Sequence, residues 1–330
     1  SAIVLPACCT HTGNIMHSRF VGGGWRLCYI VVFGLLFLSS GEMMTNAMSS
    51  QTGGKMVGQR VLVTGAGRGI GRAIALWMSA EGAKVAISSR TQHELQETAD
   101  ACRRNHQCAN HDAAGKDDGK DEDEDNVSMH VVDVTDSQQV EDMVQSIVLK
   151  WGGIDVLINN AGGAQAKKGP SETLDSNDLK HLLDLNVVSV HIVTSAVLRH
   201  AMLKNHDQGG GKIVNISSRA GKVGLPQMSF YVASKFALEG LTAAMAEELR
   251  DKNIQINTLS PGMVDTQSFP KPAGKPGVRS AESVADGLWT VLNNPEGVTG
   301  HYLHVDELDQ ARARGLPDTA ALKPIREPLF

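Results

Sequence analysis

The sequence predicts an α/β protein with a doubly wound, parallel sheet that is covered by helices on both faces. The first observation is a short apolar run, Arg60–Thr64, which leads through a glycine-rich turn into residues 72–79, where apolar side chains recur at helical spacing. The second is that further strand-like runs alternate with helical stretches, at 84–88, 127–132, 154–158 and 212–218. Such alternation favours parallel pairing, and parallel sheets bind ligands beyond the carboxyl ends of their strands.

The composition fits one large domain or two small ones, because 42% of the 330 residues are hydrophobic. The net charge is −5, but residues 112–125 hold eight acids and two lysines, a net of −6, so that the remainder sums to about +1. This balance disfavours a nucleic-acid partner. The five cysteines have no metal-ligand spacing, so we expect no metal site, and they favour a reducing, cytoplasmic location.

Residues 1–55 have the character of a leader outside the folded domain. The apolar run Leu27–Leu38 follows Arg19 and Arg26, and with Met16 as initiator it has the pattern of a signal peptide or a short anchor. Its twelve residues fall short of the roughly 20 that a membrane span needs. The alternative is that the segment derives from an untranslated region. A real anchor would place the protein at the endoplasmic reticulum membrane instead of the cytoplasm.

A glycine-rich turn, Thr64–Gly71, connects the first strand with the first helix. Its glycines, spaced as Gly65-x-x-x-Gly69-x-Gly71, let the backbone approach phosphate oxygens and let the helix pack closely on the strand. The strand, the turn and the helix N-terminus together have the pattern that cradles a pyrophosphate. The alternative is a glycine-rich turn without a ligand, which the flanking strand and helix disfavour.

The second strand ends in Ser89 and Arg90, at the position where a dinucleotide site distinguishes its cofactors. A carboxylate at this strand end would bind the ribose hydroxyls of NAD, whereas the sequence has Ser89 there. The guanidinium groups of Arg90 and of Arg68 in the glycine turn suit a 2′-phosphate, because a planar fork pairs with phosphate oxygens. We therefore expect NADP(H) as the cofactor. The alternative is that one or both arginines are solvated surface residues.

Residues 91–104 are predicted to form a helix. The acidic run at 105–126 is predicted to be an exposed, largely disordered insertion, because it has no apolar periodicity. The next strand leads to Asp133, which we expect near an adenine ring. A helix at 137–151 and another strand then lead into Asn159-Asn-Ala-Gly162.

Tyr231 and Lys235 are spaced so that a helix over them places both side chains on one face. A phenol is a poor proton donor at neutral pH, with a reference pKa of about 10, and a nearby ammonium favours its phenolate form. Ser218 lies 13 residues before Tyr231, at the end of a strand, where its hydroxyl can hold a carbonyl oxygen. The alternative for Tyr-x-x-x-Lys alone is an ordinary helix face with an exposed pair.

Several motifs occur in the order found in the short-chain dehydrogenase/reductase family, which the sequence resembles over residues 56–307. These motifs are Thr64–Gly71, Asn159–Gly162, Ser218, Tyr231-x-x-x-Lys235 and Ser260-Pro-Gly262. The resemblance implies a single Rossmann-type domain with a seven-stranded parallel sheet, a nicotinamide cofactor, a small-molecule substrate and a homodimer or homotetramer.

The resemblance also implies roles for particular residues. The catalytic set is Asn186, Ser218, Tyr231 and Lys235. In it, Asn186 holds a water in a proton relay behind Lys235, or alternatively satisfies a backbone break in a long helix. The residues expected to bind the cofactor follow the ends of the strands: Gly65, Arg68, Gly69, Ile70, Gly71, Ser89, Arg90, Asp133, Val134, Asn160, Ala161, Gly162, Tyr231, Lys235, Pro261, Gly262, Val264 and Thr266. The last four belong to the loop that contacts the nicotinamide end.

Two stretches depart from the family pattern. The segment that usually covers the substrate is short here, at residues 263–278, and its prolines suggest a stiff lid over an open pocket. The last strand, in His301–Glu307, lacks the Gly-Gly that often follows it. The tail at 308–330 is expected at the surface or at a subunit contact.

The motifs and the resemblance together predict an NADP(H)-dependent carbonyl reductase, or an alcohol dehydrogenase in the reverse direction. Tyr231 would give its proton to the carbonyl oxygen, Lys235 would bind the nicotinamide ribose and lower the pKa of Tyr231, and Ser218 would orient the carbonyl. The alternatives are a 3-oxoacyl-thioester reductase of fatty-acid synthesis, a membrane-anchored retinol or steroid dehydrogenase, and a non-catalytic cofactor-binding regulator. The regulator would have lost active-site residues that are all present here.

Overall fold

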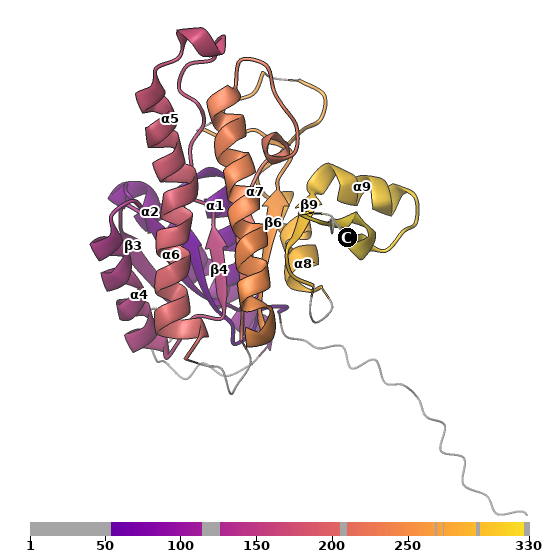
Figure 1. Cartoon of the computed structure of the whole chain (residues 1–330). Helices are drawn as coiled ribbons and strands as arrows, with labels where there is room; N and C mark the ends of the chain where they lie inside the picture. The colour runs from indigo at the N-terminus through magenta and orange to yellow at the C-terminus, as the bar shows by residue number, and fades with distance from the viewer. Residues whose placement is uncertain are drawn as a thin grey trace, which may run out of the picture. The chain divides into compact units, whose positions relative to one another are not determined.

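The computed structural model describes residues 54–113, 126–204, 210–267, 269–272, 274–294 and 298–326. The predicted leader at 1–55, apart from its last two residues, and most of the acidic run therefore lie outside the described residues. The described chain forms a mostly parallel sheet with helices on both faces, which confirms the predicted fold class (Figure 1).

Eight strands form the main sheet, in the order β10-β9-β6-β5-β4-β1-β2-β3. The strands are β1 (Arg60–Thr64), β2 (Lys84–Ser89), β3 (Val127–Val131), β4 (Val156–Asn159), β5 (Gly211–Ile216), β6 (Ile254–Ser260), β9 (His301–His304) and β10 (Leu322–Pro324). Every neighbouring pair is parallel except β10 with β9. The chain reverses its winding between β1 and β4, which is the point where a doubly wound sheet binds its ligand.

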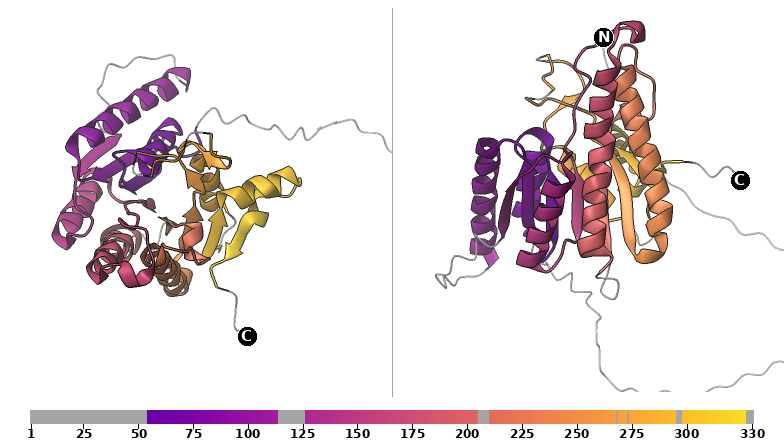
Figure 2. Two further views of the ribbon diagram at one scale, coloured as in Figure 1. Left: turned by 90° about the horizontal axis from the view of Figure 1, so that it is seen from above. Right: turned by 60° about the vertical axis from the view of Figure 1, so that its left-hand side comes forward.

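Helices cover both faces of this sheet. One group comprises α1 (Gly69–Ala80), α2 (Gln92–Ala113) and α8 (Val284–Leu292), and the other comprises α4 (Ser137–Trp151), α5 (Ser176–Leu183), α6 (Ser189–Val197) and α7 (Ser229–Leu249). Seen from above, α1 and α2 lie on the opposite side of the strands from α4, α6 and α7 (Figure 2). A π-helical turn at Asp184–Val188 joins α5 to α6.

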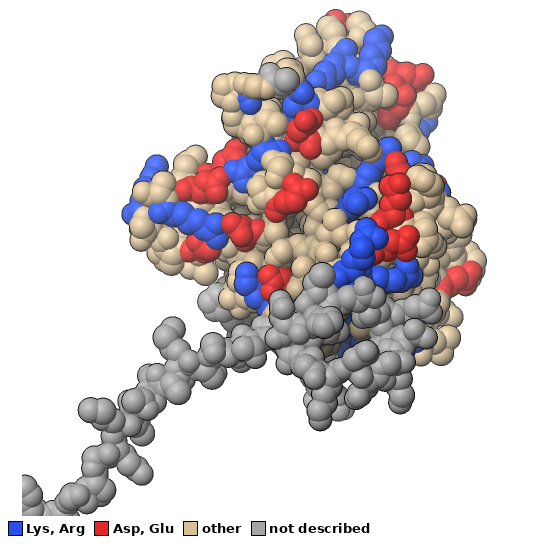
Figure 3. Space-filling model, turned by 180° about the vertical axis from the view of Figure 1, so that it is seen from behind, with Lys and Arg blue, Asp and Glu red and all other residues tan. Residues whose placement is uncertain are grey.

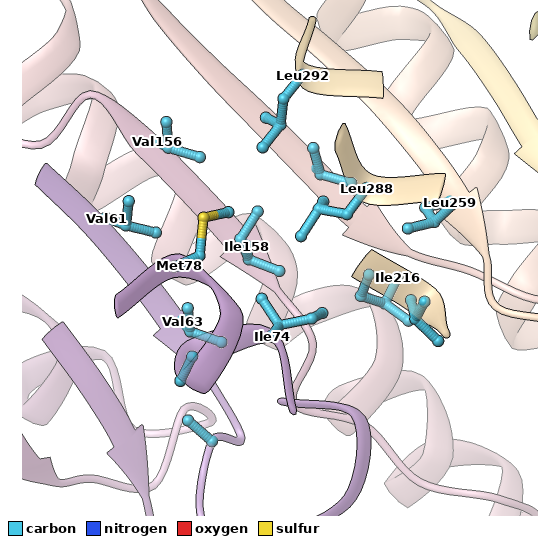
Figure 4. Packing of buried hydrophobic residues seen from close by; sticks show 14 of the residues in the cluster. Val61, Val63, Ile74, Met78, Val156, Ile158, Ile216, Leu259, Leu288 and Leu292 are labelled. Carbon is cyan, nitrogen blue, oxygen red and sulfur yellow. The ribbon is translucent and has the colours of Figure 1, made fainter. Parts of the chain in front are cut away.

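Successive residues of β1 point to opposite faces and join two separate cores. Val61 and Val63 pack with Ile74 and Met78 of α1 in the first core (Figure 4). Leu62 belongs to the second core, together with side chains of α4, α6 and α7. Because a strand that is buried on both faces is apolar throughout, β1 lacks the alternation of a half-exposed strand.

The described part of the C-terminal tail, residues 308–326, packs on the fold, whereas the sequence placed the tail at 308–330 at the surface or at a subunit contact. The helix α9 (Val305–Ala313) buries Leu308 and Ala311, and β10 adds an antiparallel edge strand to β9. The resemblance implied seven strands, whereas the main sheet has eight. The physical reason is that α9 begins directly at the end of β9, so that the chain turns back and pairs with the free edge of that strand.

Helix α2 is longer than the sequence predicts. It continues from the expected end at Arg104 to Ala113, so the start of the segment at 105–126 is helical and not disordered. His106 supplies a buried contact that the apolar pattern does not reveal, since its Nε2 lies 2.7 Å from the carbonyl oxygen of Ala83.

Among the described residues, the helical stretch Ser176–Met202 has the length and hydropathy of a membrane span, and 50% of its most apolar window is buried. This stretch contacts β4 and α7, and apolar side chains within it such as Leu182, Val190 and Val193 are buried in the protein core. The apolar run at 27–38, which has the pattern of a signal peptide or a short anchor, lies outside the described residues.

A truncation after Gly315 tests whether the tail supports the fold. It removes β10 and the buried side chains of Ala321 and Ile325, and it exposes the edge of β9. Burial of an isoleucine side chain contributes about 1.5–3 kcal/mol, so the midpoint of thermal unfolding should fall by about 3–12 °C. Replacement of residues 114–125 by a Gly/Ser linker is the control and should leave the midpoint unchanged. An unchanged midpoint after truncation would contradict a structural role for the tail.

Candidate active site

The glycine turn lies between the end of β1 and the start of α1. Gly65 and Gly69 both have positive φ, +65° and +57°, a backbone conformation that favours glycine. A Cβ at Gly65 would lie 2.8 Å from the Cα of Ala161, and one at Gly71 would lie 2.3 Å from the carbonyl oxygen of Gly65. No side chain caps the N-terminus of α1. The turn therefore presents backbone N–H groups in an open cradle, which fits a pyrophosphate.

Hydrogen bonds connect the residues after β4 to this turn. The Asn160 side chain donates from Nδ2 to the carbonyl oxygens of Thr64 and Gly65, at 3.0 and 3.1 Å. The Thr64 hydroxyl oxygen accepts from the backbone N–H groups of Asn160 and Ala161, at 3.0 and 3.1 Å. These hydrogen bonds join the predicted cofactor residues that follow β1 and β4 into one unit. The Asn160 side chain therefore holds the backbone of the glycine turn in place.

The predicted adenosine corner contains Ser89, Arg90, Arg68 and Asp133, as the sequence predicts, and both arginines are already paired with acids. Arg90 lies 3.8 Å from Asp133, and Arg68 lies 3.1 Å from Glu94. Hydrogen bonds from the backbone N–H and the hydroxyl of Thr135 lower the pKa of Asp133. A 2′-phosphate in this corner would have to share the arginines with two carboxylates.

Glu94 is a residue of this corner that the sequence reasoning missed. A Cβ added to Gly67 in the glycine turn would lie 3.0 Å from the Ser89 hydroxyl and 3.3 Å from a carboxylate oxygen of Glu94. The available signal was the spacing Thr91-x-x-Glu94 at the start of α2, which is a capping-box pattern that places the acid in the first helical turn.

Two of the predicted cofactor residues contribute their side chains mainly to the core. Ile70 packs against the first core, and Val134 is 7% exposed within the second. The loop after β6 lies close to the glycine turn: a Cβ at Gly69 would lie 3.3 Å from the Cβ of Thr266. In the same loop Gly262 has φ of +75° and Val264 is buried. Thr266, within the predicted lid, thus lies next to the cradle.

Tyr231 and Lys235 lie on the same face of α7, as their spacing predicts. The Lys235 Nζ lies 5.9 Å from the centre of the Tyr231 ring and donates to the carbonyl oxygen of Ile216, at the end of β5, at 3.0 Å. Burial raises the pKa of Tyr231, against the direction expected from Lys235 alone, while a hydrogen bond with Ser218 lowers it. Burial lowers the pKa of Lys235 to about 8, and Glu239 opposes this decrease.

Ser218 follows β5, and its hydroxyl faces the phenol of Tyr231 on α7. Its hydroxyl oxygen accepts from the backbone N–H of Ala220 at 3.1 Å, which caps the short turn Arg219–Gly221. The same hydroxyl also lowers the pKa of the Tyr231 phenol, which it faces. The structure therefore brings together the predicted residues Ser218, Tyr231 and Lys235.

Asn186 lies in the π-helical turn between α5 and α6 and is 1% exposed. Its Oδ1 accepts from the backbone N–H of Gly163 at 2.8 Å, and its Nδ2 donates to the Gly163 carbonyl oxygen and to the Ser234 hydroxyl, both at 3.0 Å. Ser234 stands next to Lys235 on α7. Asn186 thus ties the loop after β4 to the helix that carries Tyr231, and its place in a π turn fits the alternative role at a backbone break.

Gln165 is a second residue that the sequence reasoning missed. It is 7% exposed, and its Oε1 accepts from the backbone N–H groups of Phe230 and Tyr231, at 3.0 and 3.2 Å. Its Nε2 donates to the carbonyl oxygens of Lys167 and Gln227, at 2.7 and 3.1 Å. Gln165 therefore caps the first turn of α7 and holds the backbone of Tyr231. No sequence signal identifies it, because it acts from a loop 66 residues away.

A shallow apolar hollow of about 610 Å³ lies against the first turns of α7. Its lining includes Leu225, Pro226, Val232 and Phe236, and none of the four predicted catalytic residues. We therefore place the site by the polar contacts around Tyr231 and not by the size of a hollow.

Comparison with known proteins agrees with this geometry. A family model described as short chain dehydrogenase matches residues 59–273. The chain is 34% identical to a 3-oxoacyl-[acyl-carrier-protein] reductase of Thermotoga maritima, over 64% of this chain and 76% of that protein. It is 36% identical to gluconate 5-dehydrogenase of Gluconobacter oxydans, over 64% and 73%. Among solved structures, ElxO with NADP bound has 28% identity and a TM-score of 0.62, covering 75% of this chain and 96% of that one.

Proposed function

Because this chain belongs to the short-chain dehydrogenase/reductase family, we propose that it is an NADP(H)-dependent enzyme that reduces a carbonyl group or oxidises the corresponding alcohol. The family consists of oxidoreductases that bind nicotinamide cofactors and act on small molecules. The observation that carries the proposal is the meeting of Ser218, Tyr231 and Lys235 at the edge of the sheet that also bears the glycine turn.

A nicotinamide cofactor would supply the hydride. The protein would position that cofactor and supply the proton. The glycine turn and the N-terminus of α1 would hold the pyrophosphate. The residues after β4, Asn160–Gly162, and the loop at 261–266 would border the nicotinamide half. The tight packing of Gly65 and Gly71 supports this assignment, because a Cβ at either position would clash with the residues after β4 or with the turn itself and so change the shape of the cradle.

Tyr231 would donate its proton to the substrate oxygen in reduction and accept it in oxidation. Burial raises its pKa, so the phenol is protonated at neutral pH, as a proton donor must be. The ammonium of Lys235 would stabilise the phenolate that forms. Ser218 would hold the substrate oxygen with its hydroxyl, which faces Tyr231. Asn186 and Gln165 would keep α7 and the loop after β4 in the required positions.

The preference for NADP(H) is supported by the charges at the adenosine corner. Ser89 stands where a carboxylate would repel a 2′-phosphate, and Arg90 and Arg68 bring positive charge to the same place. The ElxO structure with NADP bound adds support by analogy. The carboxylates of Asp133 and Glu94 reduce the attraction, so the preference should be moderate.

A second candidate function is the reduction of a 3-oxoacyl thioester, and a group of lysines favours it. Ion pairs elsewhere on the described surface join neighbouring charges of opposite sign, and acids and bases are interspersed on the face in Figure 3. In contrast, no described acidic side chain forms an ion pair with Lys168, Lys271 or Lys275. Burial lowers the pKa of Lys271, and Lys168 and Lys275 lower it further by repulsion, while the charge of Asp265 opposes them. An anionic group on the substrate would relieve this repulsion.

These lysines flank the end of α7 that carries Tyr231. Lys168 precedes Gly169, whose N–H donates to the carbonyl oxygen of Gln227 just before α7. Lys271 and Lys275 lie in the lid, between β7 (Met263–Val264) and β8 (Val278–Arg279). The phosphates of a thioester carrier would meet them at the entrance to the proposed site.

A membrane-anchored retinol or steroid dehydrogenase has less support, because it depends on a segment outside the described residues. A non-catalytic regulator is disfavoured because the four predicted catalytic residues are present. Family members are typically oligomeric, and a homodimer or homotetramer and a cytoplasmic location stay predictions for this chain.

The variant Tyr231→Phe tests the proton donor. It keeps the ring and removes the hydroxyl, so the fold should survive while kcat falls by about 10²–10⁴-fold, the range that general acid catalysis supplies. The measurement is NADPH absorbance with a panel of carbonyl substrates. Cofactor binding and the midpoint of thermal unfolding serve as controls and should not change. Turnover near that of wild type in a folded, cofactor-binding variant would refute the role of Tyr231.

The double variant Ser89→Asp, Arg90→Ile tests the choice of cofactor. One or two exposed contacts of about 1.5 kcal/mol give a preference for NADPH of about tenfold to a few hundredfold. The variant should move the ratio of kcat/KM values towards NADH by removing attraction and adding repulsion. High salt should reduce the wild-type preference, because exposed pairs are screened. A wild type that prefers NADH, or a ratio that does not move, would contradict the proposal.

Charge reversal at the lid separates the two candidate functions. The double variant Lys168→Glu, Lys271→Glu should raise KM for acetoacetyl-CoA by about tenfold, since exposed charge-assisted contacts contribute about 1–2 kcal/mol together. It should leave KM for the neutral substrate 2,3-butanedione unchanged. Equal effects on both substrates, or no turnover of the thioester by wild type, would exclude the second candidate.

A further inference from the structure

Glu239 is a buried carboxylate behind the proposed site that the proposed mechanism does not use. It follows Lys235 by one turn on α7, and it is 2% exposed. A carboxylate buried this deeply needs hydrogen bonds and a positive partner to offset the loss of its hydration. The identity of those partners shows what Glu239 does.

Side chains from three different segments contact the two carboxylate oxygens. The hydroxyl of Ser217, directly after β5, donates to Oε1. The hydroxyl of Thr258 on β6 donates to Oε2 at 3.0 Å, and the Lys222 ammonium lies 3.2 Å from the same oxygen. Glu239 therefore ties α7 to the carboxyl ends of two neighbouring strands.

These contacts hold the turn that carries Ser218 from both sides. Ser217 precedes Ser218, and Lys222 follows the turn. Between them, Gly221 packs so closely that a Cβ there would lie 2.9 Å from the Cγ of Glu239. The position of the Ser218 hydroxyl thus depends on the Glu239 side chain.

The C-terminal segment keeps Lys222 in place against this carboxylate. The Lys222 Nζ donates to the carbonyl oxygen of Ile325 at 3.2 Å and lies 4.6 Å from the centre of the Tyr302 ring on β9. Lys222 therefore has fixed partners on three sides, and its ion pair with Glu239 is held by the tail of the chain.

The charge of Glu239 acts on Lys235, the amine of the proposed site. Burial lowers the pKa of Lys235 to about 8, and Glu239 is the charge that opposes this decrease. Other titratable and charged groups face this pair or its contacts from the surrounding elements: Arg219, Lys222, Tyr231, Tyr302 and Glu307. Two of these groups, Arg219 and Lys222, are cations, which disfavour a further ammonium, whereas Glu239 is the acid whose charge favours the ammonium form of Lys235.

We propose that Glu239 is a positioning residue of this site, which keeps the Lys235 amine in its ammonium form at neutral pH and fixes the turn that presents Ser218. This inference rests on the proposed function and extends it to a residue outside the Tyr-x-x-x-Lys pattern. Lys235 stabilises the phenolate of Tyr231 only as an ammonium. Loss of the Glu239 charge should therefore lower the pH above which activity declines.

The variant Glu239→Gln tests the inference, because glutamine keeps the shape and loses the charge. The titration of Lys235 is followed by the ¹³C shift of its Cε in lysine-labelled protein without ligand, assigned with Lys235→Arg. A close opposite charge typically shifts a pKa by about 1–3 units, so the titration midpoint should fall by about one unit or more. With NADPH and 2,3-butanedione, kcat at pH 8 should then fall about fivefold or more, with a smaller loss at pH 6.

The matched control is Glu248→Gln, the same change on the exposed face of α7, which should alter neither readout. If Glu239→Gln does not fold, the double variant Lys222→Met, Glu239→Gln removes both charges of the pair. The titration midpoint of Lys235 should then still fall, but by less than in the single variant, because a nearby cation is lost as well. An unshifted titration of Lys235 in a folded variant overturns the inference. A loss of kcat that is equal at every pH also overturns it, because a merely structural role would produce that result. Absence of turnover in wild type would refute the proposed function, and the titration of Lys235 could still be read.

Discussion

The hydrogen bond from the Lys235 ammonium to the carbonyl oxygen of Ile216 is the interaction on which the rest of the site depends. It joins α7, the helix that carries Tyr231, to the end of β5, and so it sets Tyr231 near Ser218. An ammonium in this position is fully desolvated, which explains why its pKa falls to about 8. The carboxylate of Glu239 and the carbonyl of Ile216 are the groups that make its burial tolerable.

A chain of buried amides and hydroxyls fixes the helices on the sheet beneath this contact. Asn159 at the end of β4 donates to the Thr194 hydroxyl on α6 and to Asn215 on β5, both at 2.9 Å. Asn215 donates in turn to the Thr242 hydroxyl on α7 at 2.8 Å. Apolar side chains alone permit a helix to slide on a sheet, whereas these bonds are lost if it moves, and a buried polar group without a partner is costly. The network therefore gives α6 and α7 one position relative to the strands.

The adenosine corner is organised differently, because its charged groups are exposed. Arg68 and Arg90 have side chains that are 52% and 67% exposed and are paired with Glu94 and Asp133. Such pairs are weak, and solvent competes for each partner. Under the proposed function, recognition at this end of the cofactor would rest on a balance of surface charges, while recognition at the reacting end would rest on buried groups in fixed positions.

The sequence by itself determined the fold class, the glycine turn and the pairing of Tyr231 with Lys235, because each depends on spacing within one strand, turn or helix. Only the tertiary structure decided the residues that hold this site in place. Gln165 caps α7 from a distant loop, Asn186 binds Gly163 and Ser234, and the tail after residue 308 returns to the sheet as β10. These contacts join segments far apart in the chain, so no local pattern of residues predicts them. The physical reason is that a buried polar atom takes whichever partner the folded chain brings within about 3 Å, and that partner has no fixed separation along the sequence.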